Sequence, residues 1–185
     1  MIDYVPFQAD LIPEAAKLPA NRHCQDRLRR PELSPRFEVS EVTQQALTLA
    51  YQRPHTQGVA ALQGGKLLGY LFGTLTINAL WGRTGWVRPV GCSLDQGSPL
   101  DLLAELYARL GQQWIDYGCF AHYVITSILD SALVDNWFSL GFAIEQVRGL
   151  YSMKPPSPAT KTRRMESRSA LPPCKTRRRS ARFPM

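Results

Sequence analysis

A helix pattern of about 19 residues between two strand patterns constrains the fold of this chain most. It begins at Ser98, a good N-cap residue, with Pro99 in the first helical position and the acid Asp101 close behind. Gly118 is a natural residue to end it. Apolar residues recur at helical spacing and form a single stripe, comprising Leu103, Leu106, Tyr107, Leu110, Trp114 and Tyr117.

Strand patterns flank this helix at Trp86–Ser93 and Ala121–Leu129. A strand, a long helix and a second strand form a crossover, which predicts that the two strands are parallel. Upstream, Gly58–Leu62 and Lys66–Thr76 flank a Gly64-Gly65 hairpin signal. Their short connections predict an antiparallel meander that continues into the strand at 86–93.

Other patterns complete the expected element order. They predict a strand at Asp3–Phe7, a helix over 11–28 interrupted at Pro19, a helix from a Ser40 cap to Tyr51, a helix over Ser131–Leu140 ended by Gly141, and a final strand at Phe142–Tyr151. The predicted fold class is therefore α/β, or α+β: a mixed, mostly antiparallel sheet with one parallel crossover pair and helices on both faces.

Composition changes sharply after residue 151, which predicts a folded domain over 1–151 and a separate tail over 152–185. The tail holds ten basic residues, one acid and six prolines, and few large apolar residues, so we expect it to be disordered. It accounts for a charge of +9 in a chain of net +7, which leaves −2 on the domain. The domain therefore gives no electrostatic reason to expect a polyanion partner.

Three interpretations of the tail remain open. It could bind nucleic acid or acidic surfaces through Arg177, Arg178 and Arg179, but no interleaved aromatic residues are present to stack on bases. It could be a solvated extension, or the frameshifted end of a longer gene. The abrupt change where a second domain would begin favours the frameshift, and we do not expect a nucleic-acid partner.

The cellular compartment is predicted from what the sequence lacks. Four scattered cysteines, Cys24, Cys92, Cys119 and Cys174, show no disulfide framework. No apolar run approaches the roughly 18 residues of a membrane span, and the N-terminus has no secretory pattern. We therefore expect a cytoplasmic protein without a membrane partner.

The element order, the helix end at Trp114 to Gly118 and the ending Ser139-Leu140-Gly141-Phe142 together resemble the GNAT family of acetyl-CoA-dependent N-acetyltransferases. The resemblance covers about residues 3–151. The N-terminal layout is similar to the first halves of tandem two-domain members, which implies a second GNAT domain as a partner.

The resemblance implies an acetyl-CoA pyrophosphate site at Gln96, Gly97 and Ser98, where glycine freedom and a helix N-terminus favour an anion. Two features weaken it: Pro99 lacks an N–H donor, and the carboxylates of Asp95 and Asp101 repel phosphate by about 1 kcal/mol each when solvated. The same residues also suit a plain helix cap. Acetyl-CoA binding is therefore expected to be weak or absent.

The family places the thioester between the strands at 86–93 and 121–129, where backbone N–H groups from Val90 to Cys92 would polarise its carbonyl. The tyrosine that protonates the leaving thiolate in the family corresponds to Trp137, whose indole is no usable acid. Glu145 is a candidate base only by its nearness to the last strand. The catalytic residues therefore remain unassigned; Tyr107, Tyr123 and Tyr151 are not placed by spacing.

Two functions follow. The first is acetyl transfer from acetyl-CoA to a small-molecule or peptide amine by direct attack, impaired in this isolated chain. The alternative is a non-catalytic GNAT-like module of a two-domain protein. A Cys119–His122 metal pair is a weak signal because no second pair accompanies it, and a Cys and a His of the core at the start of a strand explain it better, so no metal site is expected.

Overall fold

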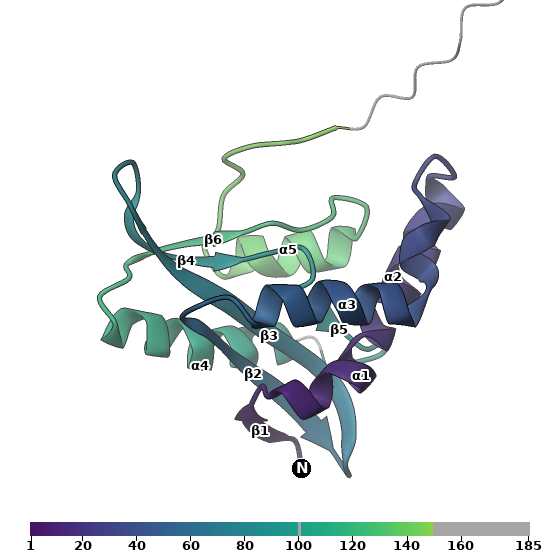
Figure 1. Cartoon of the computed structure of the whole chain (residues 1–185), viewed down its shortest axis with the longest axis horizontal. Helices are drawn as coiled ribbons and strands as arrows, with labels where there is room; N and C mark the ends of the chain where they lie inside the picture. Colours follow the sequence, from purple (N-terminus) through teal and green to yellow (C-terminus); the bar gives the residue numbers. More distant parts are fainter. Residues whose placement is uncertain (100, 150–185) are drawn as a thin grey trace, which may run out of the picture. The chain divides into compact units, whose positions relative to one another are not determined.

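A six-stranded mixed sheet with helices on both faces forms the folded unit in the computed structural model, which describes residues 1–99 and 101–149 (Figure 1). The predicted tail over 152–185 lies outside the described residues. The strands are β1 (Asp3–Pro6), β2 (Thr56–Gln63), β3 (Lys66–Asn78), β4 (Gly82–Val87), β5 (Cys92–Leu94) and β6 (Ala121–Val124). The helices are α1 (Ile12–Ala15), α2 (Lys17–Arg29), α3 (Ser40–Tyr51), α4 (Leu102–Asp116) and α5 (Ser131–Ser139), with short 3-10 turns η1 (Ala9–Leu11) and η2 (Pro35–Glu38).

The strand order is β1-β2-β3-β4-β6, with β5 paired to β3 beside β4. All pairings are antiparallel except β4 with β6, whose register runs from Thr84 opposite Ala121 to Val87 opposite Val124. Gly64 and Gly65, at φ 58° and 82°, make the β2–β3 turn with the left-handed backbone that the hairpin requires. The predicted meander and the parallel crossover pair are both confirmed.

The predicted third strand, Trp86–Ser93, is wrong as a single element. It divides into β4 and β5, which pair with different stretches of β3, Thr74–Asn78 and Gly69–Leu71. Between them the chain turns on itself, because the Gly91 N–H donates to the Arg88 carbonyl at 2.7 Å. The Gly91 carbonyl still accepts from the Phe72 N–H at 2.7 Å, so the turn stays attached to β3.

The two predicted strands nearest the C-terminal end of the fold also differ. Strand β6 ends at Val124 rather than Leu129, and residues 142–149 form no strand, although Phe142–Tyr151 was predicted as one. Residues 150 and 151 lie outside the described residues. A strand gains its hydrogen bonds from a neighbour, and no described segment pairs with 142–149; Ile144 and Val147 are accordingly more than 60% exposed.

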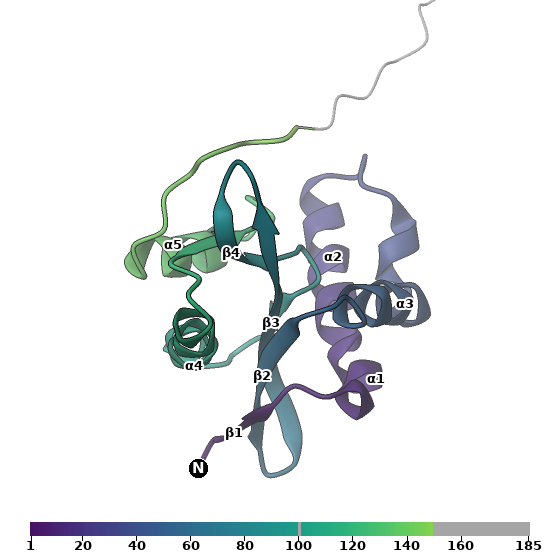
Figure 2. The same cartoon turned by 60° about the vertical axis from the view of Figure 1, so that its left-hand side comes forward.

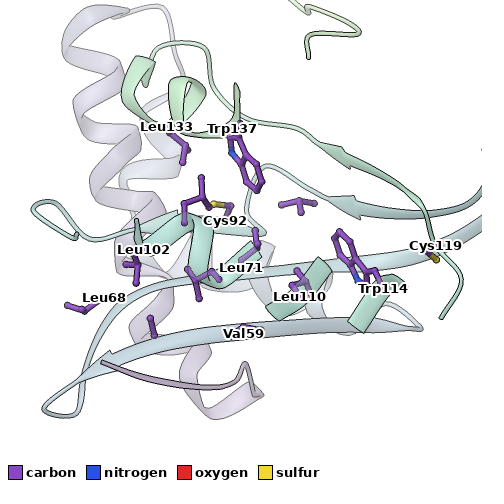
Figure 3. Close-up of a cluster of buried hydrophobic side chains, with 14 residues drawn as sticks. Val59, Leu68, Leu71, Cys92, Leu102, Leu110, Trp114, Cys119, Leu133 and Trp137 are labelled. Atoms are coloured by element: carbon purple, nitrogen blue, oxygen red, sulfur yellow. The ribbon is translucent and has the colours of Figure 1, made fainter. Parts of the chain in front are cut away.

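Helices α4 and α5 lie on one face of the sheet and α1, α2 and α3 on the other (Figure 2). Each face carries a cluster of buried side chains. One, drawn in Figure 3, joins α4 and α5 to the sheet and contains Trp114 and Trp137. The other joins α1 and α3 to the opposite face through Phe7, Tyr70 and Phe72. The predicted placement of helices on both faces is confirmed.

Helix boundaries depart from prediction in small ways. The break expected at Pro19 falls at Ala16, between α1 and α2, because proline cannot donate to the carbonyl four residues before it and its ring crowds that turn. Val39 rather than Ser40 is the N-cap of α3. Tyr117, predicted to complete the apolar stripe of α4, is 57% exposed at the end of that helix.

Candidate functional site

The sheet opens between β5 and β6, next to the parallel pair. Strand β6 pairs with β4 over Ala121–Val124, and the Ile125 N–H still donates to the Val87 carbonyl at 2.9 Å. Beyond that point, no described strand pairs with the outer edge of β5. The splay that the family resemblance implied between these two strand segments is therefore present.

The register of β5 shows which of its backbone groups face this opening. Phe72 N–H donates to Gly91 O, and Asp95 N–H donates to Leu68 O at 2.7 Å. Antiparallel pairs alternate between bonded and non-bonded, so Cys92, opposite Leu71, is in a non-bonded pair. Its N–H and carbonyl therefore point away from β3, whereas the Gly91 N–H is already donated to Arg88.

Arg22 of α2 spans this edge. Its guanidinium donates to the Cys92 carbonyl at 3.0 Å and to the Pro89 carbonyl at 3.2 Å. Among the residues predicted to polarise the thioester carbonyl, Cys92 therefore has an N–H that faces the opening. Val90 is held through its own backbone carbonyl, which accepts a hydrogen bond from the Tyr70 hydroxyl at 3.0 Å. The sequence pattern gave no sign of Arg22, which lies 70 residues from its partner.

The predicted pyrophosphate loop is a tight turn anchored to β3. Ser98 N–H donates to the Asp95 carbonyl at 3.2 Å, and Gly97 has a φ of 84° that favours glycine. The Leu68 carbonyl accepts from both the Asp95 N–H and the Ser98 hydroxyl, the latter at 3.0 Å. The loop geometry is therefore fixed before any ligand binds.

These contacts correct the predicted helix cap. The Ser98 hydroxyl donates to Leu68 rather than capping α4, which begins at Leu102 with Asp101 as N-cap and no side-chain cap bond. Asp95 forms an ion pair with the exposed Lys66, which offsets part of the repulsion expected from Asp95. Asp101 is exposed.

Gln96, Gly97 and Ser98 line one wall of a cavity of about 540 Å³. The opposite walls come from α2, over 18–29, and from the start of α5, over 130–136. Leu94 also lines the cavity. Like Cys92, it is in a non-bonded pair with β3, so its backbone N–H and carbonyl point away from β3. The structure thus brings the predicted loop to the opening beside β5 and adds α2, which the sequence did not place there.

The fit of acetyl-CoA to this cavity is uneven. Cys92 N–H offers a donor beside the opening, while its carbonyl is occupied by Arg22. At the loop, the Ser98 N–H and hydroxyl already donate hydrogen bonds within the protein, and Pro99 has no N–H. Within 95–99, the N–H groups of Gln96 and Gly97 therefore remain to bind the pyrophosphate. The opening suits the amide-bearing arm of the coenzyme better than the loop suits its pyrophosphate.

Trp137, at the position of the family's tyrosine, is buried in the α4–α5 core at 3% exposure (Figure 3). Its ring packs edge-on against Tyr107 and Phe142, with centroids 5.8 and 4.9 Å away. The indole Nε1 is buried without a described hydrogen-bond partner. It can donate a hydrogen bond but not a proton, so this position supplies no general acid.

Tyr107 and His122 form a separate polar pair. The Tyr107 hydroxyl lies 2.8 Å from His122 Nδ1, and His122 Nε2 lies 3.1 Å from the Cys119 carbonyl. Both ring nitrogens are thus engaged, and the contact to Cys119 is made to its backbone, as expected of core residues. Burial lowers the pKa of His122 and raises the pKa of Tyr107, so it favours the neutral form of each.

The remaining candidates lie elsewhere. Glu145 is exposed on 142–149 and does not line the cavity. Tyr123 stacks on Trp86 with centroids 4.5 Å apart, and Tyr151 lies outside the described residues. Within 1–99 and 101–149, no group of three or more His, Cys, Asp or Glu could hold a metal ion, and no helix is long and apolar enough to cross a membrane.

Comparison with known proteins identifies the fold. The sequence matches no protein-family profile and no curated protein. A predicted acetyltransferase from Clostridium acetobutylicum, solved with acetyl-CoA, is similar with a TM-score of 0.60 and 11% identity, over 82% of this chain and 96% of that one. Ribosomal-protein-alanine N-acetyltransferase from Brucella melitensis biovar Abortus 2308 gives 0.56 and 12%, over 83% and 100%.

The aminoglycoside N-acetyltransferase AAC(6')-Iy, solved with CoA, is similar with a TM-score of 0.55 and 14% identity, over 83% of this chain and 95% of that one. The chain therefore has the fold of the GNAT N-acetyltransferases, as the sequence resemblance implied. These identities are low, so the likeness establishes the fold, and the activity has to be argued from the site.

Proposed function

We propose that this chain transfers an acetyl group from acetyl-CoA to a small-molecule or peptide amine, and that it does so weakly. The observation that carries the proposal is the cavity of about 540 Å³ at the opening of the sheet, which joins the predicted coenzyme loop to the edge of β5. The fold shared with acetyltransferases supports the choice of reaction.

Acetyl-CoA, when bound, supplies the thioester. The residues of this chain then have three tasks. Gln96 and Gly97 present N–H groups to the pyrophosphate, and the Cys92 N–H faces the opening and polarises the thioester carbonyl. The neutral amine would form the C–N bond as the C–S bond breaks, and its nitrogen would then lose one proton to water. Because Trp137 gives up no proton, the leaving thiolate has to take its proton from water, which slows the transfer.

The non-catalytic module is a second candidate because of the Arg22 contact. The Arg22 guanidinium donates a hydrogen bond to the Cys92 carbonyl, which the amide-bearing arm of the coenzyme would otherwise approach. The absence of a strand at 142–149 also leaves this side of the domain for a partner to complete. In that case the chain would serve a second domain as scaffold rather than catalyst.

Calorimetric titration of acetyl-CoA into the full chain and its Pro99→Gly variant tests the proposal. Micromolar binding by the parent supports a working coenzyme site, and binding gained with Pro99→Gly supports a site weakened at the loop. Absence of binding in both would refute the enzyme and leave the module. For a chain that binds, Trp137→Tyr should raise the rate of thiol release from acetyl-CoA, with Trp137→Phe as the matched control.

A further inference from the structure

Arg88 follows the last residue of β4, and its half-buried guanidinium lacks a partner. The preceding residue, Val87, accepts the last hydrogen bond from the β6 side through its carbonyl. The Arg88 Nε is buried and has no hydrogen-bond partner among the described residues. No described carboxylate forms an ion pair with this guanidinium. A buried donor of a charged group is unfavourable without an acceptor, so the fold leaves a requirement for one here.

A second guanidinium without an ion pair lies near the first. Arg53 belongs to the turn between α3 and β2, where its carbonyl accepts from the Thr56 hydroxyl at 2.8 Å. No described carboxylate pairs with Arg53. Burial lowers the pKa of Arg88, and the like charge of Arg53 lowers it further. Two neighbouring cations that no described acid compensates favour the binding of an anion.

The turn that carries Arg53 has an unusual backbone. Within 1–99 and 101–149, His55 is the one residue other than glycine with a positive φ, at 60°. Its carbonyl accepts from the Leu75 N–H at 3.1 Å, which attaches the turn to β3. Residues held in such sparsely populated conformations are concentrated at ligand-binding sites. The position of Arg53 beside the sheet is therefore fixed by the fold.

Aromatic side chains border these two arginines. Four residues lie opposite one another across β2, β3, β4 and β6, namely Thr56, Thr74, Trp86 and Tyr123. The ring of Trp86 stacks on Tyr123, and Trp81, 39% exposed, packs against both, with centroids 5.5 and 6.0 Å away. Side chains alternate along a strand, so Arg88 follows Trp86 on the same face, roughly 7 Å along the chain.

We infer that this face of the sheet binds an aromatic carboxylate, with its carboxylate on Arg88 and Arg53 and its ring on the cluster of Trp81, Trp86 and Tyr123. A planar guanidinium matches a carboxylate through two parallel hydrogen bonds. Aromatic faces and edges favour a ring as their neighbour. The domain has a net charge of −2, which disfavours a polyanion and suits a small ligand with one charge. The inference goes beyond acetyl transfer and does not require the coenzyme.

Phenylacetate titrated into the ¹⁵N-labelled full chain, without acetyl-CoA, tests the site by NMR. The indole N–H signals of Trp81 and Trp86 should shift, whereas those of Trp114 and Trp137, buried in the α4–α5 core, should not. 2-Phenylethanol keeps the ring without the charge, and acetate keeps the charge without the ring. Both should bind about 10-fold more weakly than phenylacetate or worse, as should inorganic phosphate, which lacks the ring.

Arginine variants test the charge. Arg88→Met removes the cation at similar length and should weaken phenylacetate binding by about 10-fold or more. Arg53→Met, at an exposed position, should weaken it by about threefold. Arg83→Met is the matched control, because Arg83 lies on the same strand but donates to the Tyr117 carbonyl at the end of α4. It should change the affinity by less than about twofold.

A thermal melt accompanies each variant. Arg88→Met removes a charge that lacks an ion pair, so its Tm should equal or exceed that of the parent, which a residue required for packing would not show. Equal phenylacetate affinity in the parent and Arg88→Met would overturn the inference, as would absence of binding by the parent. If Arg88→Met fails to fold, Arg53→Met and the ligand comparison still decide.

The ligand comparison separates the two halves of the site. Equal binding of phenylacetate and 2-phenylethanol would refute the role of the arginines, and equal binding of phosphate and phenylacetate would refute the aromatic part. Acetyl-CoA titrated separately keeps this site distinct from the proposed function. Phenylacetate binding that depends on Arg88, with no acetyl-CoA binding, would sustain the carboxylate site and refute the acetyltransferase.

Discussion

Replacing Gly85 by alanine should destabilise the domain by forcing Trp114 out of its place. An added Cβ at Gly85 would lie 2.2 Å from Trp114 Cε3 and 2.5 Å from Cδ2, whereas carbon atoms in contact normally lie 3.5–4.0 Å apart. Trp114 is fully buried and cannot simply swing into solvent. Overpacking at such a site costs about 3 kcal/mol, and the loss of glycine flexibility in the unfolded chain returns somewhat under 1 kcal/mol.

The free energy of unfolding should therefore fall by about 2 kcal/mol, which corresponds to a Tm lower by about 4–8 °C for a chain of this size. Urea unfolding followed by circular dichroism measures it, with an unchanged m value as evidence that the native fold persists. Gly111→Ala is the matched control: its Cβ would lie 3.6 Å from the nearest atom, an ordinary contact, in the middle of α4. It should stabilise the domain by about 0.5–1 kcal/mol.

A double variant tests the assigned cause. If the clash with Trp114 is responsible, Gly85→Ala should cost much less in a Trp114→Leu background than in the parent. Parent-like stability of Gly85→Ala, or the same cost in both backgrounds, would mean that Trp114 does not pack on the strand as described. The reasoning that places α4 against this face of the sheet would then be wrong.

Three further predictions concern titration and assembly. Burial raises the pKa of the Cys92 thiol to about 12, so iodoacetamide at about pH 8 should modify the exposed Cys24 and leave Cys92 unmodified. Mass spectrometry measures the labelling of each cysteine, and equal labelling of the two would contradict the packing of β5. Burial lowers the pKa of His122 in the folded state, so its contribution to stability is present above the unfolded pKa of about 6.5 and is lost as the pH falls below it. Urea melts should show that loss, and His122→Gln should reduce it; an identical pH dependence would count against the buried neutral ring. Strand β6 has an edge that no described strand covers, so sedimentation at tens of micromolar protein should detect self-association, and a single monomeric boundary would argue against it.

The contact between Arg22 and the Cys92 carbonyl distinguishes the two proposed roles, catalyst and scaffold, which the sequence alone could not do. A catalyst has to admit the coenzyme beside Cys92, which requires Arg22 to leave a carbonyl that it contacts at 3.0 Å. A scaffold can keep that contact unchanged. Acetyl-CoA binding with and without an Arg22→Met change would therefore report whether the contact opposes the coenzyme.

Much of the fold could be predicted because its signals are local. The apolar stripe of α4, the Gly64-Gly65 turn and the strand–helix–strand order each depend on residues close in sequence, and each was confirmed except for Tyr117 at the end of the stripe. The Gln96–Ser98 loop was located for the same reason, since a strand end, a glycine and a helix start are adjacent there. Local propensity and periodicity were sufficient for these elements.

Strand boundaries were not fixed locally. Trp86–Ser93 has one apolar pattern, yet the chain divides it, because β3 offers pairing partners at two separate stretches. Phe142–Tyr151 has the composition of a strand, yet residues 142–149 form none, because a strand exists only with a neighbour to receive its hydrogen bonds. Pairing is a property of two segments, and a single segment cannot reveal it.

The sequence by itself determined the order of the helices and strands, the crossover and the position of the candidate coenzyme loop, since these follow from short-range spacing. The tertiary structure alone brought α2 to the cavity and set Arg22 against Cys92. In the sequence, Arg22 is an ordinary charged residue of a helix. Its contact with the edge of β5 joins segments about 70 residues apart, and local spacing cannot reveal such a contact.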